Sequence, residues 1–169
     1  MDFEFHPAVS LKPRSFNVLV APRQTFIDML NRNPNLQRFK ILYVSGNFSG
    51  ILSQLHRTFT ELEVRRGFTT FQIMTILEEN HHPFLIVEHN PQLYERARDM
   101  AGCIAQAMKQ ASREATILLY APALDRHLEA MAEFADRVFC FYEMEGAGLK
   151  QGRSISEEMA SQTTWETLS

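Results

Sequence analysis

The fold of this 169-residue chain is decided by one stretch, Phe84-Leu85-Ile86-Val87-Glu88-His89-Asn90-Pro91. Its first four residues are continuously apolar, which is typical of a strand buried on both faces. Asn90 is a good helix cap and Pro91 suits the first helical position, so the chain leaves a buried strand and enters a helix. Open α/β sheets bind ligands at the carboxyl ends of their strands. Glu88 is therefore a carboxylate at the edge where such folds keep their chemistry.

Four more apolar segments have the character of buried strands, at 16–21, 39–44, 116–121 and 138–142. Helical patterns separate them, at 24–31, 49–62, 69–80, 92–112 and 124–135. Strands that alternate with helices indicate a parallel sheet with helices on both faces. The pattern predicts an α/β three-layer sandwich with a mostly parallel sheet of five strands or slightly more.

The chain is the right length for a single domain, which we expect to span residues 1–145. Residues 1–15 contain Pro7 and Pro13 and predict an irregular N-terminal arm that packs across the core. From residue 146 the composition becomes rich in glycine and polar residues, which predicts a flexible or loosely docked tail over 146–169.

The composition excludes several classes of function. The formal charge of -3 gives no global basic footprint for nucleic acid, although a local patch remains open. No apolar run approaches the ~20 residues needed to cross a bilayer, and the acidic N-terminus lacks the features of a signal peptide. Cys103 and Cys140 have no CxxC spacing and are expected to be reduced core thiols. We therefore expect a cytoplasmic protein.

The order of strands and helices resembles the core of the RecA/KaiC-like P-loop ATPases over roughly residues 16–143. The resemblance rests on the strands at 16–21 and 39–44, on Leu85-Ile86-Val87-Glu88, and on the last two strands. It implies a RecA-like sheet with the first strand in its middle, a nucleotide loop after that strand, and Glu88 in the place of the Walker B aspartate.

The departures from the family pattern concern the phosphate site. A phosphate loop needs G-x-x-x-x-G-K-[ST], whose backbone N–H groups and lysine hold the phosphates. Here the first strand is followed by Ala21-Pro22-Arg23-Gln24-Thr25, with no glycine and no lysine before Thr25. After the second strand, where the family commonly carries a catalytic acid, this chain has Gly46-Asn47. The resemblance therefore implies a degenerate RecA-like fold, a pseudo-ATPase, without a catalytic residue we can name.

Four residues are the candidates for a nucleotide or anion site. Arg23 and Thr25 are placed to hold an anion at a helix N-terminus. Glu88 and His89 at the strand end suggest an acid–base pair or metal ligands. The alternative is a relic Glu88 that accepts hydrogen bonds, with His89 and Asn90 shaping the helix entry. No cofactor is expected, with ATP and Mg as the alternative.

Histidines offer no metal site in the sequence. His81 and His82 lie at the opposite end of the strand from His89, some 20 Å away at ~3.3 Å per residue. They cannot share one ion with it, and we expect an exposed pair and no bound metal.

Three residues are candidates for contact with a partner. Arg65 and Arg66, with Phe68 and Phe71 nearby, suggest a small anion or nucleic-acid contact, or simply solvent-facing charges. Trp165 is a strong hydrophobe in a polar segment and is a candidate anchor on a protein partner or a second copy. The alternative is that it folds back on its own domain.

We therefore expect a non-catalytic RecA-like domain that acts through protein–protein contacts, as an accessory or regulatory relative of an ATPase in DNA repair or signalling. A protein partner or a homo-oligomer is expected, without membrane association. The alternatives are a noncanonical nucleotide- or anion-binding protein, or ATPase, that uses Arg23, Thr25 and Glu88, and a small metal-dependent hydrolase built on Glu88 and His89.

Overall fold

The computed structural model describes residues 2–97, 99–144 and 148–151. Within these ranges the main sheet has seven strands, in the order β5-β4-β6-β7-β3-β8-β9. The strands from β5 to β8 are parallel to their neighbours, and β9 pairs antiparallel with β8. The predicted α/β fold with a mostly parallel sheet is confirmed. The strands are β3 (Phe16–Val20), β4 (Ile41–Ser45), β5 (Leu62–Arg66), β6 (Phe84–Glu88), β7 (Thr116–Ala121), β8 (Arg137–Met144) and β9 (Gly148–Gln151).

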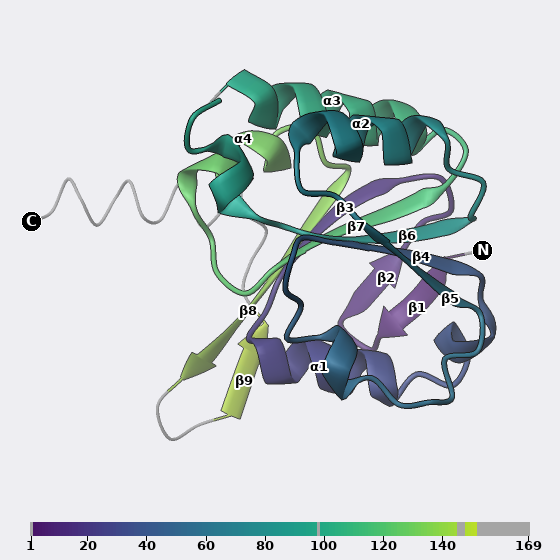
Figure 1. Cartoon of the computed structure of the whole chain (residues 1–169). Coiled ribbons are helices and arrows are strands. Elements are labelled where there is room, and N and C mark those ends of the chain that lie inside the picture. The colour runs from purple at the N-terminus through teal and green to yellow at the C-terminus, as the bar shows by residue number, and fades with distance from the viewer. Residues whose placement is uncertain (1, 98, 145–147, 152–169) are drawn as a thin grey trace, which may run out of the picture.

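Helices cover both faces of the sheet, so the strands of its middle are buried (Figure 1). One face carries α2 (Thr70–Glu78), α3 (Asp99–Ala111) and α4 (Arg126–Ala132), and the other carries α1 (Arg23–Asn31). Alternate residues of each strand point to opposite faces. The core is accordingly divided into two apolar clusters, one on each side of the sheet. The short 3-10 helices are η1 (Leu36–Arg38), η2 (Leu52–Gln54) and η3 (Pro91–Tyr94).

The N-terminal arm is part of the second layer. It forms an antiparallel hairpin of β1 (Phe3–His6) and β2 (Val9–Leu11), where the sequence predicted irregular chain. Phe5 is fully buried and its ring lies 6.2 Å from that of Phe26 in α1. The arm therefore packs against the core as expected, and it does so as a hairpin.

Two helix predictions are wrong. The segment 49–62 was expected to be one amphipathic helix, but it contains only η2 and a loop, followed by the parallel strand β5. Its apolar side chains are partly buried against the α1 layer in this irregular form. The expected helix over 92–112 is divided into η3 and α3, and Cys103 in α3 is exposed instead of buried.

The segment predicted as a tail, 146–169, contains the strand β9, which pairs with β8. Its other residues, 146–147 and 152–169, lie outside the described ranges. No helix in the described part of the chain is long and apolar enough to cross a membrane.

Candidate functional site

Several predicted site residues lie near the carboxyl edge of the sheet. The six strands in the sheet order β5-β4-β6-β7-β3-β8 all run in the same direction, so their carboxyl ends lie at this one edge. β3 lies between β7 and β8, with Val18 opposite Leu119 on one side and Val138 on the other. β6 lies between β4 and β7. The ends of β3, β4, β6 and β7 therefore meet at one edge, where ligands bind in open α/β sheets.

Glu88 is held by two hydroxyl groups. Tyr43 on the neighbouring strand β4 and Ser49 in the following loop each donate to its Oε1, both at 2.5 Å. Tyr43 is completely buried, and this burial together with the charge of Glu88 raises the pKa of the phenol. Tyr43 therefore stays a neutral donor to the carboxylate across the whole range of physiological pH.

His89 is turned toward a different partner. Its Nε2 lies 2.7 Å from Asp125 Oδ2, and only 2% of its side chain is exposed. Its Nδ1 has no hydrogen-bond partner among the described residues. Burial lowers the pKa of His89, although Asp125 opposes the shift. The imidazole is thus a buried neutral group that links the end of β6 to α4, whose N-cap is Asp125.

Arg23 and Thr25 do not converge on one ligand. Arg23 is the first residue of α1, and its guanidinium lies against Gly50, where an added Cβ would be 3.0 Å from Nη1. Thr25 is buried and lines a separate depression beside the β1–β2 hairpin. No hydrogen bond links Glu88 to His89, Arg23 or Thr25 in the described part of the chain.

A tyrosine lies beside the connection from β3 to α1, which is where the resemblance places the phosphate loop. Tyr120 Oη donates to Ala21 O at 3.1 Å. Its ring stacks on Phe26 of α1, with the ring centres 3.8 Å apart and the planes inclined by 12°. Burial raises the pKa of Tyr120 even though the nearby Arg23 opposes the shift. The connection is therefore packed and hydrogen-bonded to its neighbours.

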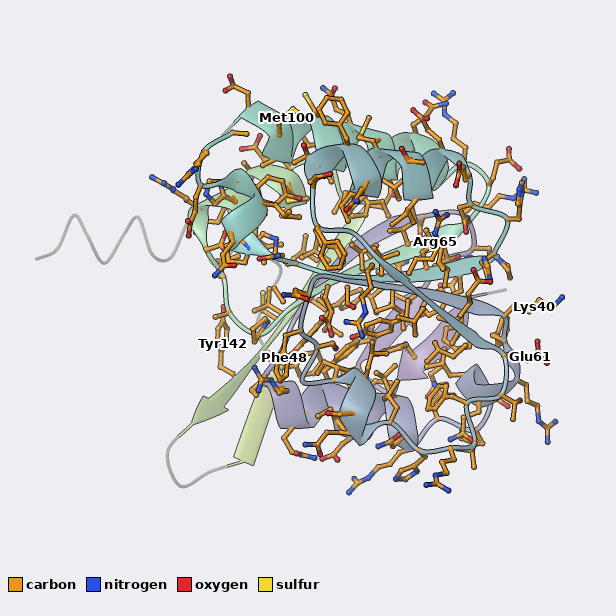
Figure 2. The ribbon with its side chains drawn as sticks, viewed as in Figure 1. Lys40, Phe48, Glu61, Arg65, Met100 and Tyr142 are labelled. Carbon is orange, nitrogen blue, oxygen red and sulfur yellow. The ribbon has the colours of Figure 1, made fainter. Side chains whose placement is uncertain are left out.

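The two arginines of β5 have structural partners. Arg66 Nη1 donates to Ser45 Oγ at 2.9 Å and to Gly46 O at 3.0 Å. Arg65 pairs with Glu79 at 3.1 Å, beneath α2 in Figure 2. They fix the ends of β4 and α2, and they do not face each other across one ligand. Trp165, the third predicted contact residue, lies outside the described residues.

Exposed phenylalanines follow the carboxyl ends of β4 and β5. Phe48 is 87% exposed, Phe68 is 52% exposed and Phe71 is 80% exposed. Figure 2 shows Phe48 on the same side of the molecule as Tyr142. Phe68 lines an open groove together with Asn47 and Asn90. The residues of this groove follow the ends of β4, β5 and β6. Phe68 therefore contributes an apolar side chain to a groove that is otherwise lined mainly by polar residues.

No three His, Cys, Asp or Glu side chains converge on a metal position in the described ranges. His82 Nε2 lies 3.2 Å from Glu63, while His81 is exposed. The histidines at the two ends of β6 therefore have separate surroundings.

Sequence reasoning missed the partners of the two strand-end residues. Tyr43 and Ser49 precede Glu88 by 45 and 39 positions, and Asp125 follows His89 by 36. The available signal for Asp125 was its place before an amphipathic helix, where aspartate is a preferred cap. Nothing local in the sequence pointed to Tyr43.

The strand order and the two-sided cover of helices define a RecA/KaiC-like α/β domain. Two solved structures share it, the flagellar accessory protein FlaH from Methanocaldococcus jannaschii and a KaiC-like protein from Pyrococcus horikoshii. Each gives a TM-score of 0.55 at 12% sequence identity, over 83% of this chain and 77% of the other. At this identity the likeness shows the fold alone.

The sequence relationship is closer to an uncharacterized protein of Archaeoglobus fulgidus. The two are 30% identical over 132 residues, which is 78% of this chain and 67% of the relative. This chain belongs to the same family as that archaeal protein. No protein-family profile matches the chain.

Proposed function

We propose that this chain is a non-catalytic RecA-like domain, without a nucleotide bound at the carboxyl edge of its sheet, that acts by contact with a protein partner at that edge. It is an accessory or regulatory relative of the RecA/KaiC-type ATPases. The proposal rests on what occupies the position of the phosphate loop.

The observation that carries the proposal is the connection from β3 to α1, which consists of Ala21 and Pro22 alone. Ala21 N–H donates to Ala121 O at 3.1 Å, and Pro22 has no N–H. A phosphate loop binds through several backbone N–H groups that face the anion. This two-residue connection has none to offer.

The surroundings of Glu88 support the same proposal. A Walker B carboxylate acts through a metal ion or a water molecule near the phosphates. Here Oε1 of Glu88 accepts hydrogen bonds from Tyr43 and Ser49, which join β6 to β4 and to the loop after β4. The carboxylate therefore has a structural task in stabilising this edge.

The exposed Phe48, Phe68 and Phe71 supply the apolar part of a contact surface. Exposed apolar side chains gathered at one place on a protein mark sites of interaction, and aromatic anchors dominate the energy of interfaces. The groove that Phe68 lines has polar amide side chains, among them Asn47 and Asn90, that suit backbone groups of a partner segment. A partner with apolar anchors fits this edge.

The catalytic part is tested by Mg-ATP hydrolysis and by thermal unfolding with Mg-ATP, Mg-ADP and phosphate. We expect no hydrolysis of ATP. We also expect that no ligand raises the unfolding temperature in a way that depends on Arg23 or Glu88, as tested with Arg23→Ala and Glu88→Gln. A ligand at 100 times its Kd adds about 2.7 kcal/mol of stability, so binding would be easily detected. Nucleotide stabilisation that depends on these two residues would replace the proposal with the alternative of a noncanonical nucleotide-binding protein.

The partner is sought with a photo-crosslinking amino acid at position 71, in extract from the source organism. Position 39 is the matched control, because Phe39 is also an exposed phenylalanine but lies by the amino ends of the strands. A defined crosslinked protein from position 71 alone is expected. Equal labelling from both positions would contradict a contact surface at the carboxyl edge.

A further inference from the structure

A cavity of about 550 Å³ lies at the opposite edge of the sheet, by the amino ends of β3 and β8. Its wall combines the turn before β3, the last turns of α3 and the start of β8. The charged residues that line it are Lys12, Arg14, Lys109, Arg113, Asp136 and Arg137. Five cations face one carboxylate here, in a chain whose formal charge is -3.

The one carboxylate is already occupied. Asp136 pairs with Lys109 and accepts a hydrogen bond from Phe16 N–H at 2.8 Å. Burial alone would raise the pKa of Asp136, but these hydrogen bonds and the charges of Lys109 and Lys12 outweigh it and lower that pKa. Asp136 is therefore fully ionised at neutral pH, and it balances Lys109.

The remaining cations have little compensation. Arg137 donates to Ser10 O at 2.8 Å and lies 4.0 Å from Asp2. Within the described ranges no hydrogen bond or ion pair is formed by the side chains of Lys12, Arg14 or Arg113. Like charges that converge on one cavity repel each other unless an anion joins them.

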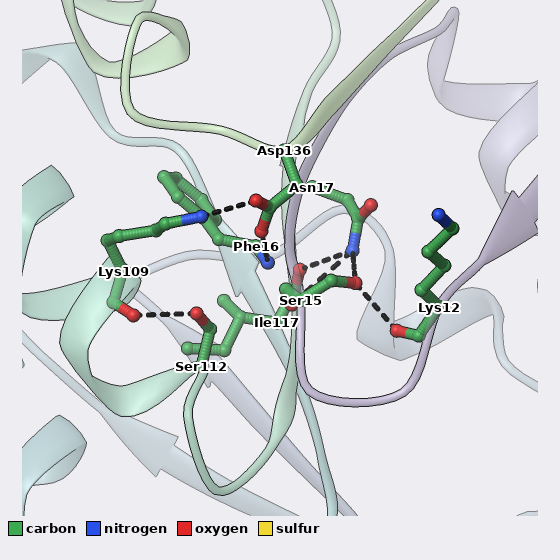
Figure 3. A network of polar contacts seen from close by, with 8 residues as sticks. All are labelled: Lys12, Ser15, Phe16, Asn17, Lys109, Ser112, Ile117 and Asp136. Atoms are coloured by element: carbon green, nitrogen blue, oxygen red, sulfur yellow. Dashed lines mark hydrogen bonds and ion pairs between the residues drawn. The ribbon is translucent and has the colours of Figure 1, made fainter.

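The inner wall of the cavity is a rigid polar network (Figure 3). Ser15 Oγ donates to Lys12 O at 2.6 Å and accepts from Asn17 Nδ2 at 2.8 Å. Figure 3 shows Lys12 and Lys109 on either side of this network. Asn17 is fully buried, and its Oδ1 has no hydrogen-bond partner among the described residues. The network thus fixes Ser15 and Asn17 in the wall between Lys12 and Lys109.

We propose that this cavity binds a small anion with at least two phosphate groups, held by Lys12, Arg14 and Arg113. Guanidinium and ammonium groups form their strongest hydrogen bonds with phosphate oxygens. The volume is that of a small-molecule site. A nucleic acid would need basic residues spread along a path, whereas these line a single cavity of an acidic protein. The site is independent of the carboxyl edge.

The test is titration calorimetry with inorganic pyrophosphate and triphosphate at low ionic strength, on the full chain. We expect saturable binding with one anion per chain, weakened by added salt because the contact is ionic. Lys12→Ala and Arg113→Ala should each raise the Kd roughly tenfold or more, since each removes a charge-assisted contact. Both side chains are exposed, so these variants should fold normally.

Arg57→Ala is the matched control, because Arg57 is an exposed arginine that does not line this cavity. It should bind pyrophosphate like the wild type, as should Glu88→Gln at the opposite edge. Absence of saturable binding, or equal weakening in Arg57→Ala, would overturn the proposal. It would also be overturned by a single-stranded oligonucleotide that binds more tightly than triphosphate and depends on Lys12 and Arg113.

Discussion

At the scale of the residue, removal of the Tyr43 hydroxyl tests whether its hydrogen bond to Glu88 stabilises the fold. Tyr43→Phe removes one donor from a partly buried carboxylate, so we expect the free energy of unfolding to fall by about 1.5–3 kcal/mol. In a Glu88→Gln background the same change should cost about 1 kcal/mol, because the acceptor is then neutral. Urea unfolding of the four proteins measures this. An equal cost in both backgrounds would show that the hydroxyl does not act through the carboxylate.

His89 gives a prediction about pH. In the unfolded chain a histidine titrates near 6.5, but in the folded protein burial lowers the pKa of His89. Between these two values only the unfolded chain binds the proton. The free energy of unfolding should therefore fall as the pH falls below about 6.5, by at most about 1.4 kcal/mol per pH unit for one group.

His89→Gln should flatten this part of the curve of stability against pH, measured by urea unfolding between pH 7.5 and 5. Burial also lowers the pKa of His6, so part of the slope should remain in His89→Gln and disappear only when His6→Gln is added. An unchanged slope in His89→Gln would contradict the neutral buried imidazole.

At the scale of the element, Thr69 and Gln72 cap the start of α2. Thr69 Oγ1 accepts from Gln72 N–H at 3.2 Å, and Gln72 Oε1 accepts from Phe68 N–H at 2.7 Å. Thr69→Ala should lower the free energy of unfolding by about 1 kcal/mol through loss of the cap. Thr58→Ala, at an exposed threonine whose side chain makes no hydrogen bond within the described ranges, should change it by less than about 0.5 kcal/mol. Similar losses in both variants would argue against the capping role.

The elements that could be predicted are those whose two ends are marked in the sequence by a proline or a helix-capping residue. Phe84–Glu88 is bounded by Pro83 and by the Asn90 cap, and the structure places β6 there. The segment 49–62 has apolar residues at helical spacing but no equivalent stop. Its side chains pack against α1 from a loop, because β5 must reach the outer side of β4. A periodic pattern without a stop signal indicates which side chains are buried but does not determine the backbone conformation.

The site could be predicted only in part, for the same reason. The position of Glu88 at a strand end follows from the apolar run before it. Its partners come from β4 and the loop after it, and the cations of the amino-edge cavity come from separate segments. Contacts between residues from such distant segments depend on the order of the strands in the sheet, and no local sequence pattern indicates that order.

At the scale of the whole molecule, the β1–β2 hairpin is a structural layer. Phe5 is buried against α1, so Phe5→Ala should lower the free energy of unfolding by about 3–5 kcal/mol. Phe71→Ala, at an exposed phenylalanine, should change it by less than about 0.5 kcal/mol. Urea unfolding of both variants measures the difference. A small loss in Phe5→Ala would mean that the arm is a dispensable addition to the core.

The interior position of β3, between two strands that come late in the chain, also determines when the protein can finish folding. Its neighbours are β7 and β8, and Phe16 pairs with Ile117 while Asn17 pairs with Arg137. During synthesis at about 5–20 residues per second, β3 leaves the ribosome roughly 5–20 s before either neighbour exists. An apolar strand must therefore wait, unpaired, for the second half of the chain. Nascent chains that end before β7 should accordingly be the species most in need of chaperones.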